Sequence, residues 1–342
     1  MTSAVRRWSE GLVHAGAEVV IAFDEGKAPI SGEGVNWVKV RHAGPTGLRT
    51  PIGLKEVLRG ADLLVLHSGW TLHNLRAAST ARRLGVPYLL EPRGAYDPHI
   101  VRRKRLLKRL WWAAMERDLV TRAAAIHVFF DTERAHLEAL GYTGPVVVAS
   151  NGVERPDGAR WDGGTGGYVL WLGRFDPEHK GLDLLLEALQ MVPRDDRPIL
   201  RIHGPDWRGR KMRVRRMVSR LGLERWAIVG DAAYGEAKRN LLSKARGFVY
   251  PSRWDACPNS VLEAVSIGVP TLVTSYPLGR FLASRGAALL AAPNPEGLAP
   301  GLRSLCSAQA SDVGRKGSEV AAEELTWDQV ARSWLTQVEA LL

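Results

Sequence analysis

The sequence predicts an α/β protein with two domains, each built around a parallel β-sheet. Short apolar runs alternate with amphipathic stretches from one end of the chain to the other, which is typical of repeated strand–helix units. A polar, glycine-rich stretch interrupts that alternation near the middle, and 342 residues suffice for two hydrophobic cores. We therefore expect domains at residues 1–153 and 168–325, a linker at 154–167, and an amphipathic helix at 326–342 that closes the chain.

The first half is expected to open with a helix over residues 3–14 and then to form six strands. In a doubly wound sheet the first strand of the chain lies centrally. Because this chain opens with a helix, we expect that strand to be missing, which leaves a gap beside the strands at 18–23 and 37–40. Another element filling the gap is the alternative. The expected strands cover residues 18–23, 37–40, 62–66, 87–90, 125–129 and 145–149.

The second half repeats the pattern with five expected strands. Between them, one helical face is expected to carry Leu182, Leu185, Leu186, Leu189 and Val192. The glycine run at 163–167 precedes a strand, whereas a phosphate-binding loop follows a strand and opens a helix, so we assign this run to the linker. The expected strands cover residues 168–172, 199–202, 226–229, 247–250 and 271–274.

The net charge of +11 predicts an anionic partner, and nucleotide diphosphates, anionic lipid and nucleic acid all qualify. Cys257 and Cys306 form no disulfide framework and stand in no metal-ligand spacing, which favours a reducing compartment. No apolar run approaches the ~20 residues needed to cross a bilayer, and the N-terminus lacks the pattern of a signal peptide. We therefore expect a cytoplasmic protein.

Two cations are predicted at the carboxyl end of the first strand of the second half. Gly173 and Arg174 end that strand, and Lys180 stands where the next helix begins. Ligands of open α/β sheets bind outside the carboxyl ends of strands, where an arginine fork and a lysine point charge suit a diphosphate. A solvated surface pair is the alternative for these two residues taken alone.

Two acids follow a later strand of the same half. Asp255 is expected in a loop and Glu263 on the helix after it, which Asn259 or Ser260 is placed to cap. The free N–H groups of that helix start, near Pro258, favour an anion. Carboxylates accept hydrogen bonds from hydroxyls, so the two acids together with Arg174 and Lys180 indicate a nucleotide-sugar site.

These segments resemble the retaining GT-B enzymes of glycosyltransferase family 4, which have two Rossmann-like domains with a cleft between them. The family pattern of strand-Gly-Arg…Lys-Gly is met at residues 172–174 and 180–181. The pattern Pro-Ser…acid, seven residues, acid…Gly-x-Pro is met at 251–270. Weaker matches stand at residues 131–133 and 151–153.

The resemblance implies that a sugar passes, with retention, from a nucleotide-diphosphate sugar to a hydroxyl of a glycan or lipid-linked acceptor. Arg174 and Lys180 would neutralise the departing diphosphate, Glu263 would hold the ribose, and Asp255 the sugar. Backbone amides near residues 258–260 would help. The chain has no Asp-x-Asp triplet, so we expect neither a metal nor another cofactor.

The sequence departs from the family pattern at three places. Asp255 stands where the family usually has Glu, which puts donor choice in doubt. The His-Asp pair after a strand of the first half is absent, and Arg93, which stands at the matching place, is expected near the substrate. The glycine-rich loop after the first strand is missing with that strand. His67, at the end of another strand, is expected near the substrate, although a hydrogen-bonding loop histidine is the simpler interpretation.

The stretch from Arg102 to Trp112 predicts a basic amphipathic helix. One arc is expected to carry Leu106, Leu107, Leu110 and Trp111, and the other Lys104, Arg105, Lys108 and Arg109. Trp112 falls among the cations, where we expect no core to receive it. This pattern suits an anionic membrane surface. A solvated helix that packs its leucines inward is the equal alternative.

Three other functions remain open at this point. A nucleotide-sugar epimerase of the same architecture would need no acceptor. A non-catalytic relative would bind only the donor. A nucleic-acid-binding protein would use the basic stretches at Arg102 and at residues 211–216, but no known module is visible and no aromatics interleave with these charges.

Overall fold

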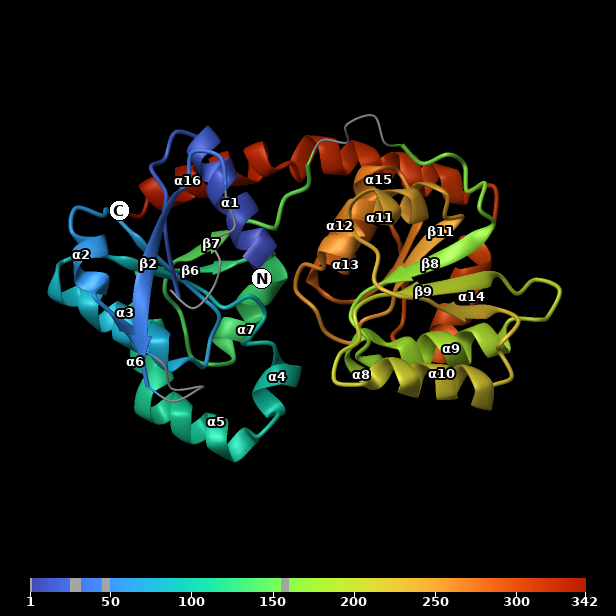
Figure 1. Ribbon diagram of the computed structural model, residues 1–342, viewed down its shortest axis with the longest axis horizontal. Coiled ribbons are helices and arrows are strands. Elements are labelled where there is room, and N and C mark those ends of the chain that lie inside the picture. Colours follow the sequence, from blue (N-terminus) through green and yellow to red (C-terminus); the bar gives the residue numbers. More distant parts are fainter. Residues whose placement is uncertain (1, 25–31, 45–49, 155–159) are drawn as a thin grey trace. The chain divides into compact units, whose positions relative to one another are not determined.

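The computed structural model describes residues 2–24, 32–44, 50–154 and 160–342, which form two compact units (Figure 1). The first unit comprises residues 1–152 together with 327–342, and the second comprises residues 153–326. Within the described ranges, no helix is both long and apolar enough to cross a bilayer.

The first unit contains a four-stranded parallel sheet in the order β4-β5-β6-β7 and a separate three-stranded sheet in the order β1-β2-β3. All six expected strands are present. The strand β3 was not predicted, and it runs antiparallel to β2, so the expectation of purely parallel sheets is wrong there. No described strand joins the two sheets, which agrees with the expected gap. The strands are β1 (Val20–Asp24), β2 (Asn36–Ala43), β3 (Thr50–Ile52), β4 (Leu64–His67), β5 (Tyr88–Glu91), β6 (Ala125–Val128) and β7 (Val146–Val148).

Helices flank these strands, and the first and last helices of the chain pack together in the same unit. Trp8 of α1 (Thr2–His14) makes edge-on contacts with Trp327 and Trp334 of α16 (Trp327–Glu339). The closing helix therefore belongs to the first unit. The other helices are α2 (Leu54–Leu58), α3 (Leu72–Arg83), α4 (Pro98–Arg102), α5 (Arg105–Trp111), α6 (Arg117–Thr121) and α7 (Arg134–Glu138), with a π-turn at Trp112–Glu116 and a 3₁₀ turn at Asp131–Glu133.

The second unit is a six-stranded parallel sheet in the order β10-β9-β8-β11-β12-β13. Strand β13 was not predicted, and the five expected strands are present. They are β8 (Tyr168–Leu172), β9 (Ile199–His203), β10 (Ala227–Val229), β11 (Gly247–Tyr250), β12 (Thr271–Thr274) and β13 (Leu289–Ala291).

The apolar face predicted for helix α9 of the second unit is confirmed. All five of its predicted residues are buried: Leu182, Leu185, Leu186, Leu189 and Val192. Burial of these side chains fixes α9 on the sheet. The helices are α8 (Pro177–Lys180), α9 (Leu182–Met191), α10 (Arg210–Arg220), α11 (Gly235–Ser243), α12 (Asn259–Ser266), α13 (Pro277–Ser284), α14 (Pro295–Ser304) and α15 (Ala310–Glu324).

Residues 160–167, which we expected to belong to the linker, are part of the second unit. The indole of Trp161 donates to the carbonyl of Ala245 at 2.7 Å, and Gly166 N donates to the carbonyl of Lys244 at 2.9 Å. The glycine run therefore lies at the amino end of β8, which agrees with its exclusion as a phosphate loop. The expectation of a free linker is wrong for residues 160–167, because hydrogen bonds attach them to the unit that follows.

Candidate functional site

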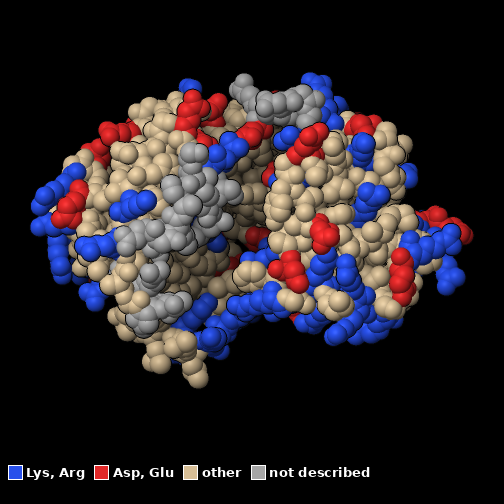
Figure 2. All heavy atoms as spheres, in the orientation of Figure 1, with Lys and Arg blue, Asp and Glu red and all other residues tan. Residues whose placement is uncertain are grey.

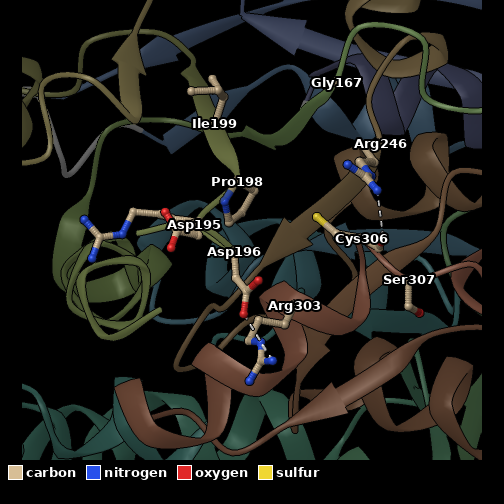
Figure 3. Close-up of a pocket in the computed structure, with 10 residues that line it drawn as sticks. Gly167, Asp195, Asp196, Pro198, Ile199, Arg246, Arg303, Cys306 and Ser307 are labelled. Atoms are coloured by element: carbon tan, nitrogen blue, oxygen red, sulfur yellow. Dashed lines mark hydrogen bonds and ion pairs between the residues drawn. The ribbon is translucent and has the colours of Figure 1, made fainter. Parts of the chain in front are cut away.

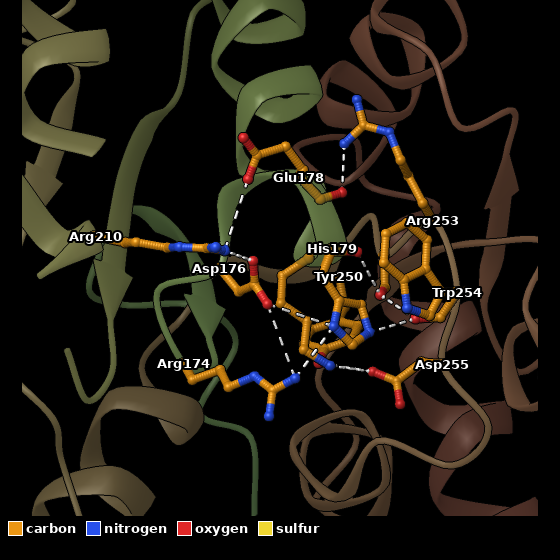
Figure 4. Close-up of polar contacts among 11 residues, drawn as sticks. Arg174, Asp176, Glu178, His179, Arg210, Tyr250, Arg253, Trp254 and Asp255 are labelled. Atoms are coloured by element: carbon orange, nitrogen blue, oxygen red, sulfur yellow. Dashed lines mark hydrogen bonds and ion pairs between the residues drawn. The ribbon is translucent and has the colours of Figure 1, made fainter. Parts of the chain in front are cut away.

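Two loops that the sequence placed at strand ends of the second unit are joined by hydrogen bonds (Figure 4). The carbonyl of His179, in α8, accepts from Arg253 N at 3.1 Å and from Ser252 Oγ at 3.0 Å. A Cβ on Gly181 would lie 1.9 Å from the carbonyl oxygen of Pro251, and its φ of +66° also favours glycine. The chain therefore needs a glycine after Lys180 to bring the loops after β8 and β11 together.

Lys180 and Asp255 meet across these loops. Lys180 Nζ lies 2.5 Å from Asp255 Oδ2, which also accepts from the Tyr250 hydroxyl at 3.1 Å. Burial raises the pKa of Asp255, but Lys180, His179 and the Tyr250 hydroxyl together lower it more, so the net shift is downward and the carboxylate stays ionised. The sequence did not assign this partner to Lys180, and the diphosphate-binding role of Lys180 stays a prediction. One of its three ammonium protons already serves Asp255.

Arg174 lies beside this pair with its guanidinium 4.9 Å from the ring centre of Trp207. Its Nη2 is 3.2 Å from His179 Nδ1, and its side chain remains partly exposed. Burial, and then the charge of Lys180, lowers the pKa of His179 to about 4, so this imidazole is neutral at pH 7. Arg174 therefore keeps a partly exposed guanidinium at the carboxyl end of β8, and its diphosphate-binding role stays a prediction.

Several residues that the sequence analysis missed hold this cluster in place. Asp176 pairs with Arg210 of α10, and Arg253 makes two 2.7 Å bonds to the carboxylate of Asp183 in α9. The ring of Trp254 stacks on His179 at 4.6 Å. These partners come from distant segments, so no local pattern indicates them.

Glu263 lies on α12, as predicted, and its Oε1 is 2.7 Å from Lys238 Nζ of α11. Among the described residues, no hydrogen bond or ion pair joins it to Arg174, Lys180 or Asp255. The predicted cap is wrong: Pro258 holds the N-cap position and no side chain caps α12, because the helix already begins at Asn259. Asn259 and Ser260 therefore contribute the first turn of the helix.

A surface pocket of the second unit lies at the opposite edge of the sheet (Figure 3). Gly167, Ile199 and Arg246 stand at or before the amino ends of their strands. Its arginines are engaged, since Arg246 donates to the carbonyl of Cys306 at 2.8 Å and Arg303 pairs with Asp196 at 3.2 Å. The pocket is therefore distinct from the predicted site.

In the first unit, His67 and Arg93 both contact Glu91, the last residue of β5. His67 Nδ1 lies 2.7 Å from Glu91 Oε2, and Arg93 Nη2 lies 3.0 Å from Oε1. The sequence placed His67 and Arg93 near the substrate but assigned no role to Glu91. The described residues contain no group of three His, Cys, Asp or Glu side chains arranged to hold a metal ion.

The basic segment of the first unit is divided into α4 and α5, with Lys104 in a left-handed conformation between them. Leu106, Leu107 and Leu110 are 77%, 61% and 70% exposed, so the interpretation that packs them inward is wrong. Figure 2 shows uncharged atoms projecting at the lower left, where Figure 1 places α5, with basic side chains nearby.

Trp112 corrects our expectation that no core receives it. It packs against the core of the first unit, 6.1 Å from both the Trp70 and Tyr96 rings. Lys108, four residues earlier, lies on the same helical face, and its Nζ is 4.9 Å from the centre of the Trp70 ring. This face of the helix therefore turns inward, whereas the three leucines of α5 turn outward.

Comparison with known proteins covers both units. A model described as "Glycosyl transferase 4-like domain" matches residues 1–152, and one described as "Glycosyl transferases group 1" matches residues 166–308. The chain is 34% identical over 115 residues to O-antigen chain mannosyltransferase B of Escherichia coli, a match that spans 32% of this chain and 30% of that protein.

Solved structures share the fold at low identity. Sucrose-phosphate synthase from Thermosynechococcus elongatus superposes with a TM-score of 0.78 at 18% identity, covering 98% of this chain and 92% of that one. Anabaena HepE in complex with UDP and glucose gives a TM-score of 0.74 at 13% identity, covering 99% and 96%. Since the two family models together span most of the sequence and the solved relatives share its fold, the chain belongs to the GT-B glycosyltransferases of the family 4 type.

Proposed function

We propose that this protein transfers a sugar, with retention, from a nucleotide-diphosphate sugar to a hydroxyl of a glycan or lipid-linked acceptor. The contact between Lys180 and Asp255, with Arg174 beside them, carries the proposal. It joins a lysine and an aspartate at the carboxyl edge of one parallel sheet, where ligands of this architecture bind, and Arg174 adds a second cation there. The named relatives add support, since one is a mannosyltransferase and another was solved with UDP and glucose.

Each side chain has a distinct task in this proposal. The exposed fork of Arg174 and the remaining protons of Lys180 stabilise the charge that develops on the departing diphosphate, in the place of a metal ion. Asp255 accepts from a hydroxyl of the sugar, with the backbone amides at Pro258, Asn259 and Ser260 nearby. Glu263 holds the ribose hydroxyls. Interactions that strengthen as the sugar–phosphate bond breaks are those that accelerate the reaction.

The test is turnover with a panel of nucleotide sugars and simple glycoside acceptors, after a thermal-shift screen has found the donor. We expect Lys180→Ala and Glu263→Ala each to lower kcat/KM by 100-fold or more, because charge stabilisation in such sites contributes about 10²–10³. Lys316→Ala, which breaks the surface pair with Glu319, is the control and should leave activity unchanged.

Three outcomes contradict the proposal. Near-wild-type turnover in Lys180→Ala removes the site assignment. Release of a free epimerised sugar without an acceptor identifies an epimerase instead. Donor binding without any turnover identifies a binding protein.

We also propose that α5 docks the protein on the anionic inner face of a membrane, where a lipid-linked acceptor is found. The three exposed leucines stand beside Arg102, Lys104, Arg105 and Arg109, which are exposed and form no ion pair within the described residues. Insertion of a leucine contributes up to about 1.5–3 kcal/mol, and each cation near an anionic surface about 1 kcal/mol. Lys108 is engaged elsewhere, because its Nζ donates to the carbonyl of Ile100 at 2.6 Å.

Sedimentation with lipid vesicles tests this docking. Wild type should pellet with vesicles that contain phosphatidylglycerol and not with phosphatidylcholine alone. Both Leu106→Ser/Leu110→Ser and Arg105→Glu/Arg109→Glu should reduce binding, whereas Leu290→Ser, at an exposed leucine of β13, should not. Binding that survives the charge reversal rules out an electrostatic membrane surface.

A further inference from the structure

A buried carboxylate lies at the centre of the polar cluster in the first unit. Glu91 ends β5, and its side chain is 3% exposed. Burial raises the pKa of this carboxyl, but His127, His67 and Arg93 outweigh burial and lower it to about 2. The carboxylate of Glu91 is therefore ionised at neutral pH, and its partners cover it.

The loops around Glu91 are held in unusual conformations. Among the described residues, five that are not glycine have positive φ, and three of them, Ser68, Trp70 and Arg93, lie in the loops after β4 and β5. Such conformations cost about 1–3 kcal/mol each and cluster at ligand sites. At Arg93 (φ 51°) the bend returns the guanidinium to the carboxylate of Glu91.

Buried contacts fix these two loops relative to the sheet. The carboxylate of Glu116, in the π-turn, accepts from Trp70 N at 2.7 Å and from the Tyr96 hydroxyl at 2.7 Å. Asn74 donates to the carbonyls of His67 and Ser68. The position of the His67 ring is thus set from several sides.

The contact with Glu91 also sets which ring nitrogen of His67 carries the proton. At 2.7 Å from an ionised carboxylate, Nδ1 is the donor, which leaves Nε2 as a hydrogen-bond acceptor. Arg93 Nε also approaches the same Nδ1, at 3.4 Å, a longer and weaker contact than the 2.7 Å one to Glu91. No described residue bonds Nε2, and His67, at 28% exposed, is the most accessible member of the cluster, whereas His127 is buried and bonded to the carbonyl of Ala149.

We propose that Nε2 of His67 binds the acceptor hydroxyl that receives the sugar, and that Glu91 is a positioning residue that holds the imidazole in the accepting form. Because the negative charge of Glu91 is neutralised by the positive charge of Arg93, the carboxyl edge of this sheet suits a neutral alcohol rather than a phosphate. The inference rests on the proposed function, and it names the side chain that recognises the acceptor.

A matched pair of substitutions separates binding from structure. In His67→Asn the amide takes the place of Nδ1 and keeps the contact with Glu91, whereas in His67→Gln the amide reaches the place of Nε2. We expect the KM for an octyl glycoside acceptor to rise about tenfold in His67→Asn and less in His67→Gln, because one neutral hydrogen bond contributes about that factor. Donor KM and hydrolysis of the donor by water should change little in both.

The control is an exposed imidazole–carboxylate contact of the same unit, His99 with Asp97 at 3.0 Å. His99→Gln should leave the acceptor KM unchanged. If His67→Asn behaves as wild type while His67→Gln loses stability, the histidine is structural and the inference is wrong.

A second measurement does not need turnover. Long-range ¹H–¹⁵N spectra of histidine-labelled protein should show His67 protonated at Nδ1, and Glu91→Gln should shift the population towards the other tautomer. Titration with octyl glucoside and octyl mannoside should move the Nε2 resonance. If the His67 ring is protonated at Nε2, or if neither glycoside moves its resonance, the inference is wrong even where the enzyme turns over its donor. If the His67 resonance responds to a glycoside but the protein binds no donor, only the proposed donor site is wrong.

Discussion

The carboxyl edges of the two parallel sheets carry different kinds of polar cluster. In the second unit, Lys180 at the end of α8 and Asp255 in a loop lie beyond the neighbouring strands β8 and β11, so their charges stand above the sheet beside the partly exposed Arg174. In the first unit the acid is the last residue of strand β5, and His67 and Arg93 cover it. An acid beyond a strand end can reach a ligand, whereas an acid within the strand acts through the residues that cover it.

The two histidines at strand ends show the same difference. His67 of β4 and His203 of β9 both end a parallel strand next to another strand of the sheet. In the register of the sheet, His67 lies opposite Glu91, and so its ring meets a carboxylate. The ring of His203 instead contacts the backbone carbonyl of Asp231 at 3.0 Å, while the carboxylate of Asp231 pairs with Lys211. One neighbouring residue therefore decides whether the histidine is oriented by a charge.

The largest effect is expected from breaking the ion pair of the second unit. Asp255→Ala leaves the buried Lys180 ammonium unpaired, which should cost about 3–5 kcal/mol in the free energy of unfolding, measured with urea. Lys180→Met/Asp255→Leu should recover most of that stability and no activity, because an apolar pair of similar volume fills the space. A cost of Asp255→Ala below about 1 kcal/mol would show that the pair is solvated.

A smaller effect is expected from acid titration of the same cluster. The pKa of His179 falls to about 4 in the folded protein, below its ordinary 6.5. The unfolded chain therefore binds the proton more readily, so the stability that His179 contributes is present above pH 6.5 and is lost as the pH falls towards 4. The loss should reach about 3 kcal/mol. Urea unfolding at pH 7 and pH 4.5 measures it, and His179→Asn should flatten the dependence.

The smallest effect is expected on nucleotide affinity, when the aromatic ring beside one arginine of each unit is removed. Trp207→Leu removes the aromatic ring beneath Arg174, so the dissociation constant of a nucleoside diphosphate should rise about two- to fivefold, since such contacts contribute about 0.5–1 kcal/mol. Phe129→Leu removes the corresponding ring near Arg93, 5.7 Å away, and should leave nucleotide affinity unchanged. Calorimetric titration with UDP and GDP measures both. Equal effects would contradict the assignment of nucleotide binding to the second unit alone.

Most strands and the donor motifs were predictable because they are local. The apolar run 168–172 is confirmed as β8 residue for residue, and Asp255 and Glu263 lie in a loop and on a helix as their spacing indicated. Strands β3 and β13 were not predicted, although β7 and β10 are equally short and were. Strand β3 contains Pro51, which is uncommon inside a strand. The role of Glu91 was missed because a single acid at the end of an apolar run gives no sign of what covers it.

Two leucine-rich helices separate what the sequence determined from what the tertiary structure decided. Both α5 and α9 carry leucines at helical spacing, and the sequence determined that each forms a helix with an apolar face, because that periodicity is a property of the local chain. The leucines of α9 are buried and those of α5 are exposed. Whether a face finds a partner depends on strand order and on which segments lie beside it. The pairing of Lys180 with Asp255 and of His67 with Glu91 depends on the same order, so only the folded chain could assign them.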